Sequence, residues 1–522
     1  MLRNLSKRHY IPCEKHEKIR ILFLFQAATV WASWESVYFA CMKDPDIEVK
    51  LLLLSETVIE KSHLVMAEEF LKERSIPYEK FEDFDLQTYK PHIAFVQFPY
   101  DLACHNPNAL SLRLKCMGIR VVYIPYGIEI VDTQTARRDH FENFVVENSW
   151  RIFTCCGEVR KEYLKYCRNR EAVRVLGSPK FDGIIHSENY PLAEDIRKKS
   201  DGRKIVLWKM HFPKKTVEDG KIVQITPELD EYIVFAENAE RYEDLFFVVM
   251  MHPKMLYGMV GSDVRGDSSL RVKADRLLSI IRTKKNMYLD TACDYRNSLY
   301  HADAIMMDRS AVMIEAAMTG KPVLLMTNSA YKEKWMEGVR QVAETFIQGS
   351  TARDMEHFLE RLRQGKLSNP EQTKKVLNDY FPYGDGLCGF RIKEAMKKEL
   401  WEEEAEKQDE RKMKIALYGA GEVCGYYMAQ YSSRKEDCEI VVLSDGSPAK
   451  WGTQFYGMTI RRPEALKEIS FDALIIMTEQ NYYEIKRRLV YELYIDERKI
   501  WRLDEMAAYW GEMINEADKA GL

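Results

Sequence analysis

The residues best suited to chemistry form a short polar turn between apolar segments in the middle of the chain. The apolar run Ala304–Met307 leads into Asp308, Arg309 and Ser310, and a helical apolar pattern follows over 311–318. This order predicts a strand, a polar turn and a helix. Ligands of open α/β sheets bind at the carboxyl ends of strands, where backbone amides attract phosphate. The turn therefore predicts a site for a nucleotide diphosphate or a ribose; the simpler alternative is that Asp308 and Ser310 only cap the helix.

Two histidines occupy equivalent places after other strand-like runs. His211 follows an apolar run that ends at Trp208, and His252 follows the run 246–251. Because imidazole can remove a hydroxyl proton near neutral pH, His211 is the candidate general base, with a phosphate contact or a structural role as alternatives. His252 and Lys254 are expected to donate to diphosphate oxygens, although a His-Pro pair also commonly serves structure alone.

Two charged residues outside these turns complete the predicted site. Lys180 follows a Gly-Ser-Pro turn and could contribute positive charge from the segment between the first two domains; the alternative is a plain turn lysine. Glu315 lies about a turn and a half of helix past Ser310. It is expected to reach the ribose of a nucleotide, or else to be exposed on the helix surface.

A glycine-rich segment near the C-terminus predicts a second binding region. Gly419, Gly421 and Gly425 follow an apolar run and precede a helical pattern, and Asp445 ends the next strand-like run, in the place of a ribose-binding acid. The spacing is GxGxxxG rather than GxGxxG, and no residue nearby offers hydride chemistry. Binding or docking is therefore predicted here, with or without a nucleotide or dinucleotide.

The elements that position these residues follow an alternating pattern. Strand-like apolar runs alternate with amphipathic helical stretches from residue 19 onward, which predicts α/β domains. We expect two similar domains over 19–200 and 201–398 and a smaller one over 413–512. The intervening segment 399–412 is dense in Lys and Glu, which predicts an exposed, charged helical linker.

Composition narrows the classes of function. The chain has 522 residues, and 77 Lys and Arg against 81 Asp and Glu give a net charge of −4, which does not favour nucleic acid. Eleven cysteines without metal-type CxxC spacing indicate reduced thiols and no metal site. The acid pairs Asp44 with Asp46 and Asp83 with Asp85 are expected at the surface. No apolar stretch fits a membrane span or a signal peptide, so a cytoplasmic protein is predicted; the basic segment 3–20 could touch the inner face of the cell membrane, a solvated tail being the alternative.

Several segments occur together in a combination typical of one family. They are Phe25-Gln26 with Val30-Trp31 and Glu35-Ser36-Val37, Gly177 to Asp182, Val206 to Trp208 with His211-Phe212, Met251 to Lys254, Asp303 to Pro322, and Asp385-Gly386 before Arg391. Through them, residues 19–395 resemble the CDP-glycerol glycerophosphotransferases, which build teichoic-acid-like polymers and related capsule structures. The 303–322 segment combined with His252-Pro253 is the most specific part of the resemblance.

The resemblance implies a fold and an activity. The fold would be two facing Rossmann-like domains of the GT-B type, an acceptor-side domain over 19–200 and a donor-nucleotide domain over 201–398. The C-terminal part, 413–512, resembles small Rossmann-like modules appended to surface-polysaccharide enzymes. The activity would be transfer of a glycerophosphate-like (alditol phosphate) group from a CDP-activated donor to a hydroxyl of a polysaccharide or lipid-linked acceptor. No metal or cofactor would be required for that transfer.

Two positions depart from the family pattern. After the aspartate the family has Tyr-Ser-Ser, whereas this chain has Arg309-Ser310-Ala311, which removes a hydroxyl and adds a cation that can pair with phosphate. Many members carry a His-Gly pair whose histidine is the favoured acceptor-side base; here Tyr126-Gly127 stands in that place, and tyrosine is a poor base at neutral pH. Two alternatives therefore stay open: a GT-B glycosyltransferase that uses a nucleotide sugar, and a non-catalytic nucleotide-binding scaffold of a polysaccharide-assembly complex.

Overall fold

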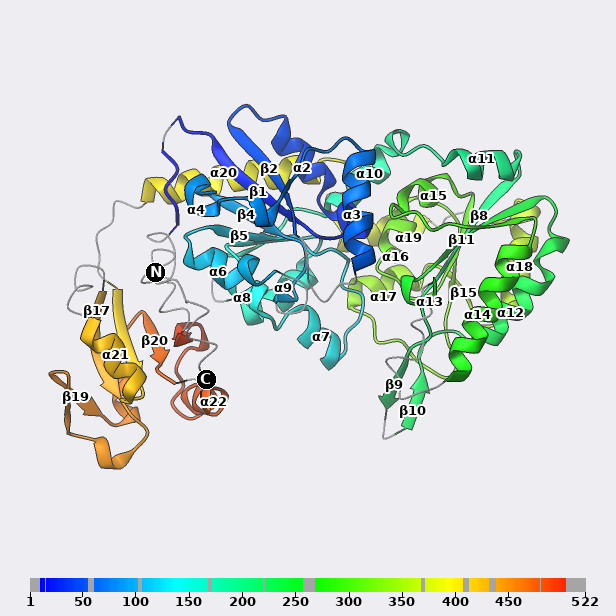
Figure 1. The fold of residues 1–522 in the computed structure, drawn as a ribbon. Helices are drawn as coiled ribbons and strands as arrows, with labels where there is room; N and C mark the ends of the chain where they lie inside the picture. Colours follow the sequence, from blue (N-terminus) through cyan, green and yellow to red (C-terminus); the bar gives the residue numbers. More distant parts are fainter. Residues whose placement is uncertain are drawn as a thin grey trace.

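The computed structural model shows three α/β units that follow one another along the chain, each built on a mainly parallel sheet (Figure 1). This confirms the predicted fold class. The structure describes residues 10–14, 16–54, 61–101, 106–167, 171–218, 221–256, 268–367, 371–406, 413–430, 438–478 and 480–503. The basic residues Arg3, Lys7, Arg8 and Lys15 lie outside these ranges. None of the described helices is long and apolar enough to cross a membrane.

The first unit is a parallel sheet with the strand order β3-β2-β1-β4-β5-β6-β7. Its strands are β1 (Ile19–Phe25), β2 (Ile47–Leu53), β3 (Glu79–Lys80), β4 (Ile93–Val96), β5 (Arg120–Tyr123), β6 (Arg151–Thr154) and β7 (Val173–Val175). Helices α2 (Glu35–Met42), α3 (Lys61–Glu73) and α9 (Gly157–Tyr166) connect them. Nearly every side chain of the central strand β1 is buried, because parallel sheets are covered on both faces.

The second unit repeats this plan with the strand order β12-β11-β8-β13-β14-β15. Its strands are β8 (Lys204–Met210), β11 (Leu245–Met251), β12 (Met287–Leu289), β13 (Ala304–Met307), β14 (Val323–Met326) and β15 (Ile347–Gly349). Among its helices are α12 (Leu229–Asn238), α14 (Ser268–Thr283), α16 (Met313–Met318), α17 (Glu337–Ala343), α18 (Ala352–Arg363) and α19 (Glu371–Tyr380). The predicted strands 246–251 and 304–307 are both present in this sheet.

The third unit is smaller and has the strand order β18-β19-β17-β16-β20-β21. Its strands are β16 (Met413–Tyr418), β17 (Cys438–Ser444), β18 (Gln454–Phe455), β19 (Met458–Arg461), β20 (Ala473–Ile476) and β21 (Ile500–Trp501). Among the described strands of this unit, only β18 and β19 pair in an antiparallel way. Two helices, α21 (Glu422–Gln430) and α22 (Tyr482–Tyr491), accompany the sheet.

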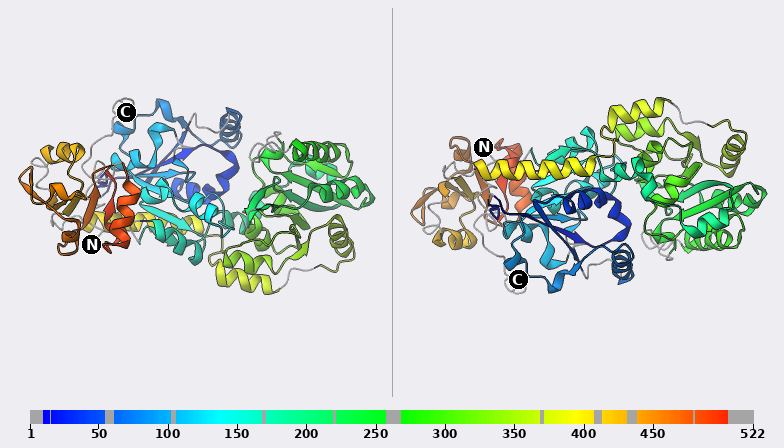
Figure 2. Two further views of the ribbon diagram at one scale, coloured as in Figure 1. Left: turned by 90° about the horizontal axis from the view of Figure 1, so that it is seen from below. Right: turned by 90° about the horizontal axis from the view of Figure 1, so that it is seen from above.

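Residues 399–406 of the segment expected to be an exposed linker instead belong to a helix that packs on the first unit, and residues 407–412 lie outside the described residues. Helix α20 (Cys388–Glu406) starts beside the second unit and runs along the first towards the third, as the yellow helix in Figure 2 shows. Its side chains Ile392, Met396 and Leu400 are buried in the same cluster as β1. They recur every four residues and so form one apolar stripe on the helix. The polypeptide therefore returns to the first unit after it has completed the second.

Several charges of α20 are paired with charges of the first unit rather than solvated. Glu403 accepts hydrogen bonds from Arg120 at 3.2 Å and from the Trp150 indole at 2.6 Å, and Glu399 accepts one from Arg174 at 2.7 Å. Near the middle of the helix, Lys397 donates to Asp44. The Lys- and Glu-rich composition predicted solvent exposure, but here it matches a complementary set of charges on the first unit.

The acid pair at Asp44 and Asp46 is one part of that set. Lys393 donates to the buried Asp44 at 2.8 Å, and Lys397 bonds both acids. Although burial opposes it, these hydrogen bonds lower the pKa of Asp44 to about 2. Asp44 was expected at the surface; it instead anchors α20.

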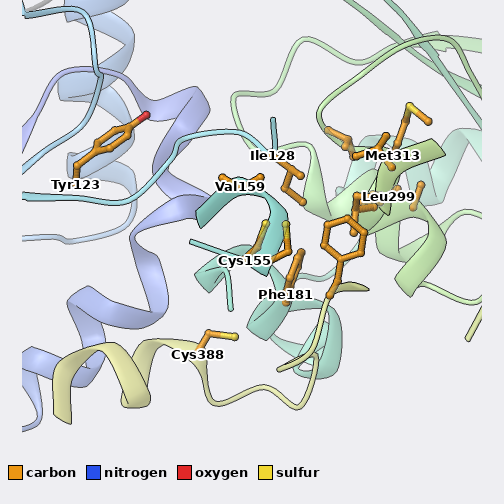
Figure 3. Packing of buried hydrophobic residues seen from close by; sticks show 14 of the residues in the cluster. Tyr123, Ile128, Cys155, Val159, Phe181, Leu299, Met313 and Cys388 are labelled. Atoms are coloured by element: carbon orange, nitrogen blue, oxygen red, sulfur yellow. The ribbon is translucent and has the colours of Figure 1, made fainter. Parts of the chain in front are cut away.

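The first and second units share one apolar core at their junction (Figure 3). Ile128 and Val159 of the first unit belong to the same buried cluster as Leu299 and Met313 of the second. Main-chain hydrogen bonds add to this contact: Asp132 N–H donates to the carbonyl of Lys334 at 2.7 Å. The two sheets are therefore held in a defined relative position.

Candidate active site

Three adjacent strands of the second sheet bring the predicted site together. Strand β8 pairs with β11 on one side and with β13 on the other, all in parallel. Their carboxyl ends therefore lie side by side, and His252, His211 and Asp308 each follow one of them directly. The imidazole ring centroids of His211 and His252 are 5.0 Å apart. The structure thus brings together three residues that are up to about a hundred positions apart in the sequence.

Asp308 fixes the loop that carries His211. Its two carboxylate oxygens lie 2.8 and 3.0 Å from the His211 N–H, and the Tyr232 hydroxyl donates to it at 3.3 Å. Asp308 is 1% exposed, and burial raises its pKa to about 7. Asp308 bonds these neighbours and does not cap the following helix, while its contact with a ligand stays a prediction. Its role is to position the His211 main chain.

The hydrogen bonds of His211 leave one ring nitrogen available as a base. Nδ1 lies 2.8 Å from the carbonyl oxygen of Phe212. A carbonyl can only accept, so Nδ1 carries the proton and Nε2 carries the lone pair. Burial and the neighbouring His252 hold the pKa of His211 well below its ordinary value. The ring is therefore neutral at physiological pH, as a proton acceptor requires.

His252 has the opposite arrangement. Its Nδ1 accepts a hydrogen bond from the main-chain N–H of Lys254 at 3.1 Å, so the neutral ring carries its proton on Nε2. Burial, together with Lys209 and Lys254, lowers the pKa of His252 to about 4. The Lys254 ammonium group lies 4.6 Å from the centroid of the Phe212 ring. His252 and Lys254 thus supply hydrogen-bond donors beside His211, whose Nε2 is a hydrogen-bond acceptor.

Lys209, which the sequence pattern did not single out, lies close to this pair. It is the next-to-last residue of β8, and burial lowers its pKa while the charge of Asp308 opposes that change. A lysine inside an apolar strand, two residues before His211, was the available signal. Tyr232 was also missed, because it belongs to helix α12 and reaches Asp308 only through the fold.

Arg309 and Ser310 occupy the turn as predicted but already have partners. Arg309 is largely buried, and its Nη1 lies 3.3 Å from Oε1 of Glu333. Neither this Nη1 nor Oε2 of Glu333 has a hydrogen-bond partner among the described residues. Burial raises the pKa of Glu333 to about 6. The hydroxyl of Ser310 accepts from the N–H of Val312 at 3.3 Å, and α16 starts at Met313, two residues later than expected.

Lys180 and Glu315 bond each other instead of facing a ligand. Lys180 Nζ donates to Glu315 at 3.1 Å, and the Tyr295 hydroxyl donates to the other carboxylate oxygen. Glu315 is 0% exposed and Lys180 4% exposed. The expected ribose contact of Glu315 and phosphate contact of Lys180 therefore have no support in this geometry. Glu315 therefore lies on the inner face of α16 rather than on its exposed surface, and its hydrogen bond to Lys180 joins the two units.

The first unit contributes Tyr126 and Gly127 next to the turn that follows β13, residues 308–311. A Cβ added to Gly127 would lie 3.2 Å from the Cβ of Ala311, so the two loops approach closely. The hydroxyls of Tyr126 and Tyr100 are 3.0 Å apart. The tyrosine that stands in place of the expected histidine is thus held close to the second unit.

In the third unit the predicted residues separate into two groups. Gly419, Gly421 and Asp445 line one cleft. Gly425 lies apart from them, since a Cβ added there would be 3.4 Å from the Tyr456 ring. The missing side chain of Gly425 therefore admits the β18–β19 hairpin, and its predicted contact with a cofactor is not supported.

Comparisons with known proteins identify the fold and one module. A family model described as C2185-like, N-terminal, matches residues 411–501. No curated protein sequence matches the chain. A structure described as a UDP-N-acetylglucosamine 2-epimerase of Listeria monocytogenes is similar, with a TM-score of 0.52 and 16% identity over 74% of this chain and 97% of that one. The UDP-GlcNAc 2-epimerase of Neisseria meningitidis (TM-score 0.49, 18% identity, 73% and 100% covered) and the wall teichoic acid polymerase TagF (0.49, 12%, 77% and 93%) are also similar. The first two units therefore have the GT-B-like arrangement of two Rossmann-like domains.

Proposed function

We propose that the chain is a transferase that moves an alditol phosphate group from a CDP-activated donor to a hydroxyl of a polysaccharide or lipid-linked acceptor. The observation that carries the proposal is the histidine pair at the edge of the second sheet. His211 presents a lone pair and His252 presents a proton, 5.0 Å apart between ring centroids. The motif resemblance over residues 19–395 supplies the donor class.

The proposed reaction is an in-line displacement at phosphorus. Nε2 of His211 takes the proton from the acceptor hydroxyl, whose oxygen forms a bond to the phosphorus of the transferred group. The bond from that phosphorus to the bridging oxygen breaks, and CMP leaves. His252 and Lys254 donate to the diphosphate oxygens and offset the charge that develops on the leaving group. The enzyme's main contribution is to orient the two substrates, and no cofactor takes part.

We assign the acceptor to the first unit and the donor to the second. The loop of Tyr126 and Gly127 lies against the turn 308–311 of the second unit. An acceptor held by the first unit would therefore meet a donor held by the second. Transfer to a lipid-linked or polymeric acceptor would place the protein at the inner face of the cell membrane.

A nucleotide-sugar enzyme is the second candidate. The fold is shared with a protein described as a UDP-N-acetylglucosamine 2-epimerase at a TM-score of 0.52. The two candidates differ in the nucleotide that they release or bind. A third, a non-catalytic nucleotide-binding scaffold, would bind a nucleotide without turning it over.

A donor screen separates these candidates. The protein is incubated with CDP-glycerol, CDP-ribitol and UDP-N-acetylglucosamine, and the released nucleotide is quantified. Release of CMP supports the proposal, while turnover of the uridine donor alone contradicts it. Stabilisation by CDP compounds in a thermal-shift measurement without any turnover would favour the scaffold.

Variants of the donor side localise the site. Lys254→Ala removes a charge-assisted hydrogen bond, so the affinity for a CDP donor should fall about tenfold or more, while Ser310→Ala should have a smaller effect. Lys375→Ala, an exposed lysine on α19, is the matched control. Unchanged affinity in both site variants would place the donor elsewhere.

A further inference from the structure

The third unit contains a cleft that the proposed transfer does not use. It lies at the carboxyl ends of β16 and β20, which are neighbours in the sheet and separate the strands β17, β19 and β18 on one side from β21 on the other. In an open α/β sheet, ligands bind where the strand order reverses in this way. The cleft has a volume of about 570 Å³. That size falls within the range of small-molecule sites.

The glycine loop leaves the floor of the cleft open. Gly419 has φ +106°, a conformation that other residues rarely adopt. Its N–H donates to the carbonyl of Ser444 at 2.8 Å, which holds the turn against β17. At Gly421 an added Cβ would meet no described atom within 4 Å. A ligand can therefore approach the main chain at Gly421.

Two cationic side chains line this cleft from different elements. Lys450 donates to Asp445 at 2.9 Å and to the carbonyl of Ala420 at 3.1 Å, so its ammonium group is fixed beside the glycine loop. Arg488 of α22 also lines the cleft, and its Nη1 lies 3.9 Å from a Cβ built on Gly446. Lysine and arginine placed around a glycine loop provide charge-assisted donors for phosphate oxygens.

Asp445 holds the glycine loop in place through its hydrogen bonds. Its Oδ2 accepts from the N–H of Ala420 at 2.8 Å, and its Oδ1 accepts from the N–H of Ser447 at 2.8 Å. Although burial opposes it, the hydrogen bond from Lys450 holds the pKa of Asp445 below its ordinary value. The carboxylate is thus ionised, and it lines the cleft with one acceptor position that these three hydrogen bonds leave unused.

The size of the sheet limits the ligand to one nucleotide. A dinucleotide fold combines two mononucleotide-binding halves, one on each side of the switch point. Here the half containing β16, α21 and β17 is complete. Beyond the switch point, the described part of the sheet offers only β20 and β21, and β21 has two residues.

We propose that this cleft binds a single nucleotide, with its phosphate groups over Gly421 between Lys450 and Arg488 and its ribose hydroxyls towards Asp445. This replaces the broader expectation of a nucleotide or dinucleotide held by three glycines. The site is separate from the histidine pair, because it belongs to another sheet, and it does not depend on the proposed transfer.

Hydrogen–deuterium exchange on the full chain tests the site, because it separates the two clefts by peptide. The probes are the four ribonucleoside 5′-diphosphates, the four matching nucleosides and NAD⁺. We expect at least one diphosphate to slow exchange in peptides covering residues 418–425 and 478–488, while its nucleoside does not. NAD⁺ should protect these peptides no better than that diphosphate.

Two variants and a control make the test specific. Gly421→Val fills the cleft and should abolish this protection, and Arg488→Ala should weaken binding about tenfold or more. Gly157→Val is the control, because a Cβ there also meets no described atom within 4 Å but lies on α9 of the first unit. The proposal is overturned if no diphosphate protects these peptides, if NAD⁺ protects them better, or if folded Gly421→Val and Arg488→Ala proteins bind as the unchanged chain does.

Discussion

Lys180 donates a 3.1 Å hydrogen bond to Glu315, although the two residues are 135 positions apart and belong to helices of different units. Lys180 is on α10 (Pro179–Ile185), which packs on α2 of the first unit and on α16 of the second. Since both side chains are buried, neither can exchange its partner for water. This buried ion pair therefore helps to fix the relative position of the two sheets.

Removing one member of this pair should destabilise the protein strongly. Glu315→Gln leaves the buried Lys180 ammonium without a counter-charge, and such a change costs about 3–5 kcal/mol of unfolding free energy. Chemical denaturation followed by tryptophan fluorescence measures it. Glu344→Gln, which breaks an exposed pair with Arg340, should cost less than about 1 kcal/mol. A loss of similar size in both variants would show that the buried pair has no special role.

Replacing His211 should remove activity without affecting stability. His211→Ala should lower turnover of the CDP donor roughly 10²–10⁴-fold, the usual effect of losing a general base. The exposed His357→Ala is the control. Because the pKa of His211 is held well below 6.5, the ring stays unprotonated through the neutral range, and the unchanged enzyme should lose activity only as the pH falls further. Normal turnover in folded His211→Ala would move the base to another residue.

Glu129 should make stability fall as the pH rises. Its Oε1 accepts from Tyr163 at 2.7 Å, its Oε2 has no hydrogen-bond partner among the described residues, and burial raises its pKa to about 7. The protonated form is favoured in the folded state, so its stabilisation is complete below the unfolded pKa and is lost as the pH rises through about 7. Between about pH 5.5 and about pH 8.5 the unchanged protein should lose about 2 kcal/mol relative to Glu129→Gln.

Denaturation curves of both proteins at the two pH values give this difference. Tyr163→Phe removes the hydroxyl that favours the ionised carboxylate and should move the loss to higher pH. A difference between the two proteins that does not change with pH would mean that Glu129 does not titrate in this range.

Two truncations should separate the third unit from the helix that leads to it. A chain ending at Glu406 keeps α20 and should fold and retain donor turnover, since the third unit has its own sheet and cores. A chain ending at Leu387 loses the buried side chains of Ile392, Met396 and Leu400. That loss costs on the order of 5–9 kcal/mol, comparable with the whole stability of a domain. Circular dichroism and the turnover assay report both results; a folded, active chain ending at Leu387 would contradict the packing role of α20.

The fold could be predicted from the sequence because its strands are long apolar runs. Ala304–Met307 has the predicted bounds, and Leu245–Met251 begins one residue before the predicted 246–251, since buried parallel strands carry a continuous signal. Helix α20 could not be placed in the same way, because paired and solvated charges look alike in composition. Its stripe of Ile392, Met396 and Leu400 was present, but the density of Lys and Glu dominated the interpretation.

The residues of the candidate site could be predicted from the sequence, but the hydrogen bonds between them could not. His211 and His252 follow strands whose adjacency a parallel sheet makes predictable. The sequence could not show that Glu315 faces inward to Lys180, because both an exposed and a buried glutamate fit a six-residue helix. The bond from the His211 main chain to Asp308 likewise depends on the order of strands in the sheet, which local patterns do not encode.

Helix α20 also sets where the third unit can act. At 1.5 Å per residue, its 19 residues carry the chain roughly 28 Å from the junction of the two large units before the third begins. The third unit lies at the far end of the first, opposite to the second (Figure 1). A molecule bound in the third unit is therefore separated by the whole first unit from the second unit, which carries the histidine pair. The proposed transfer site and the proposed nucleotide site thus lie in units on opposite sides of the first unit.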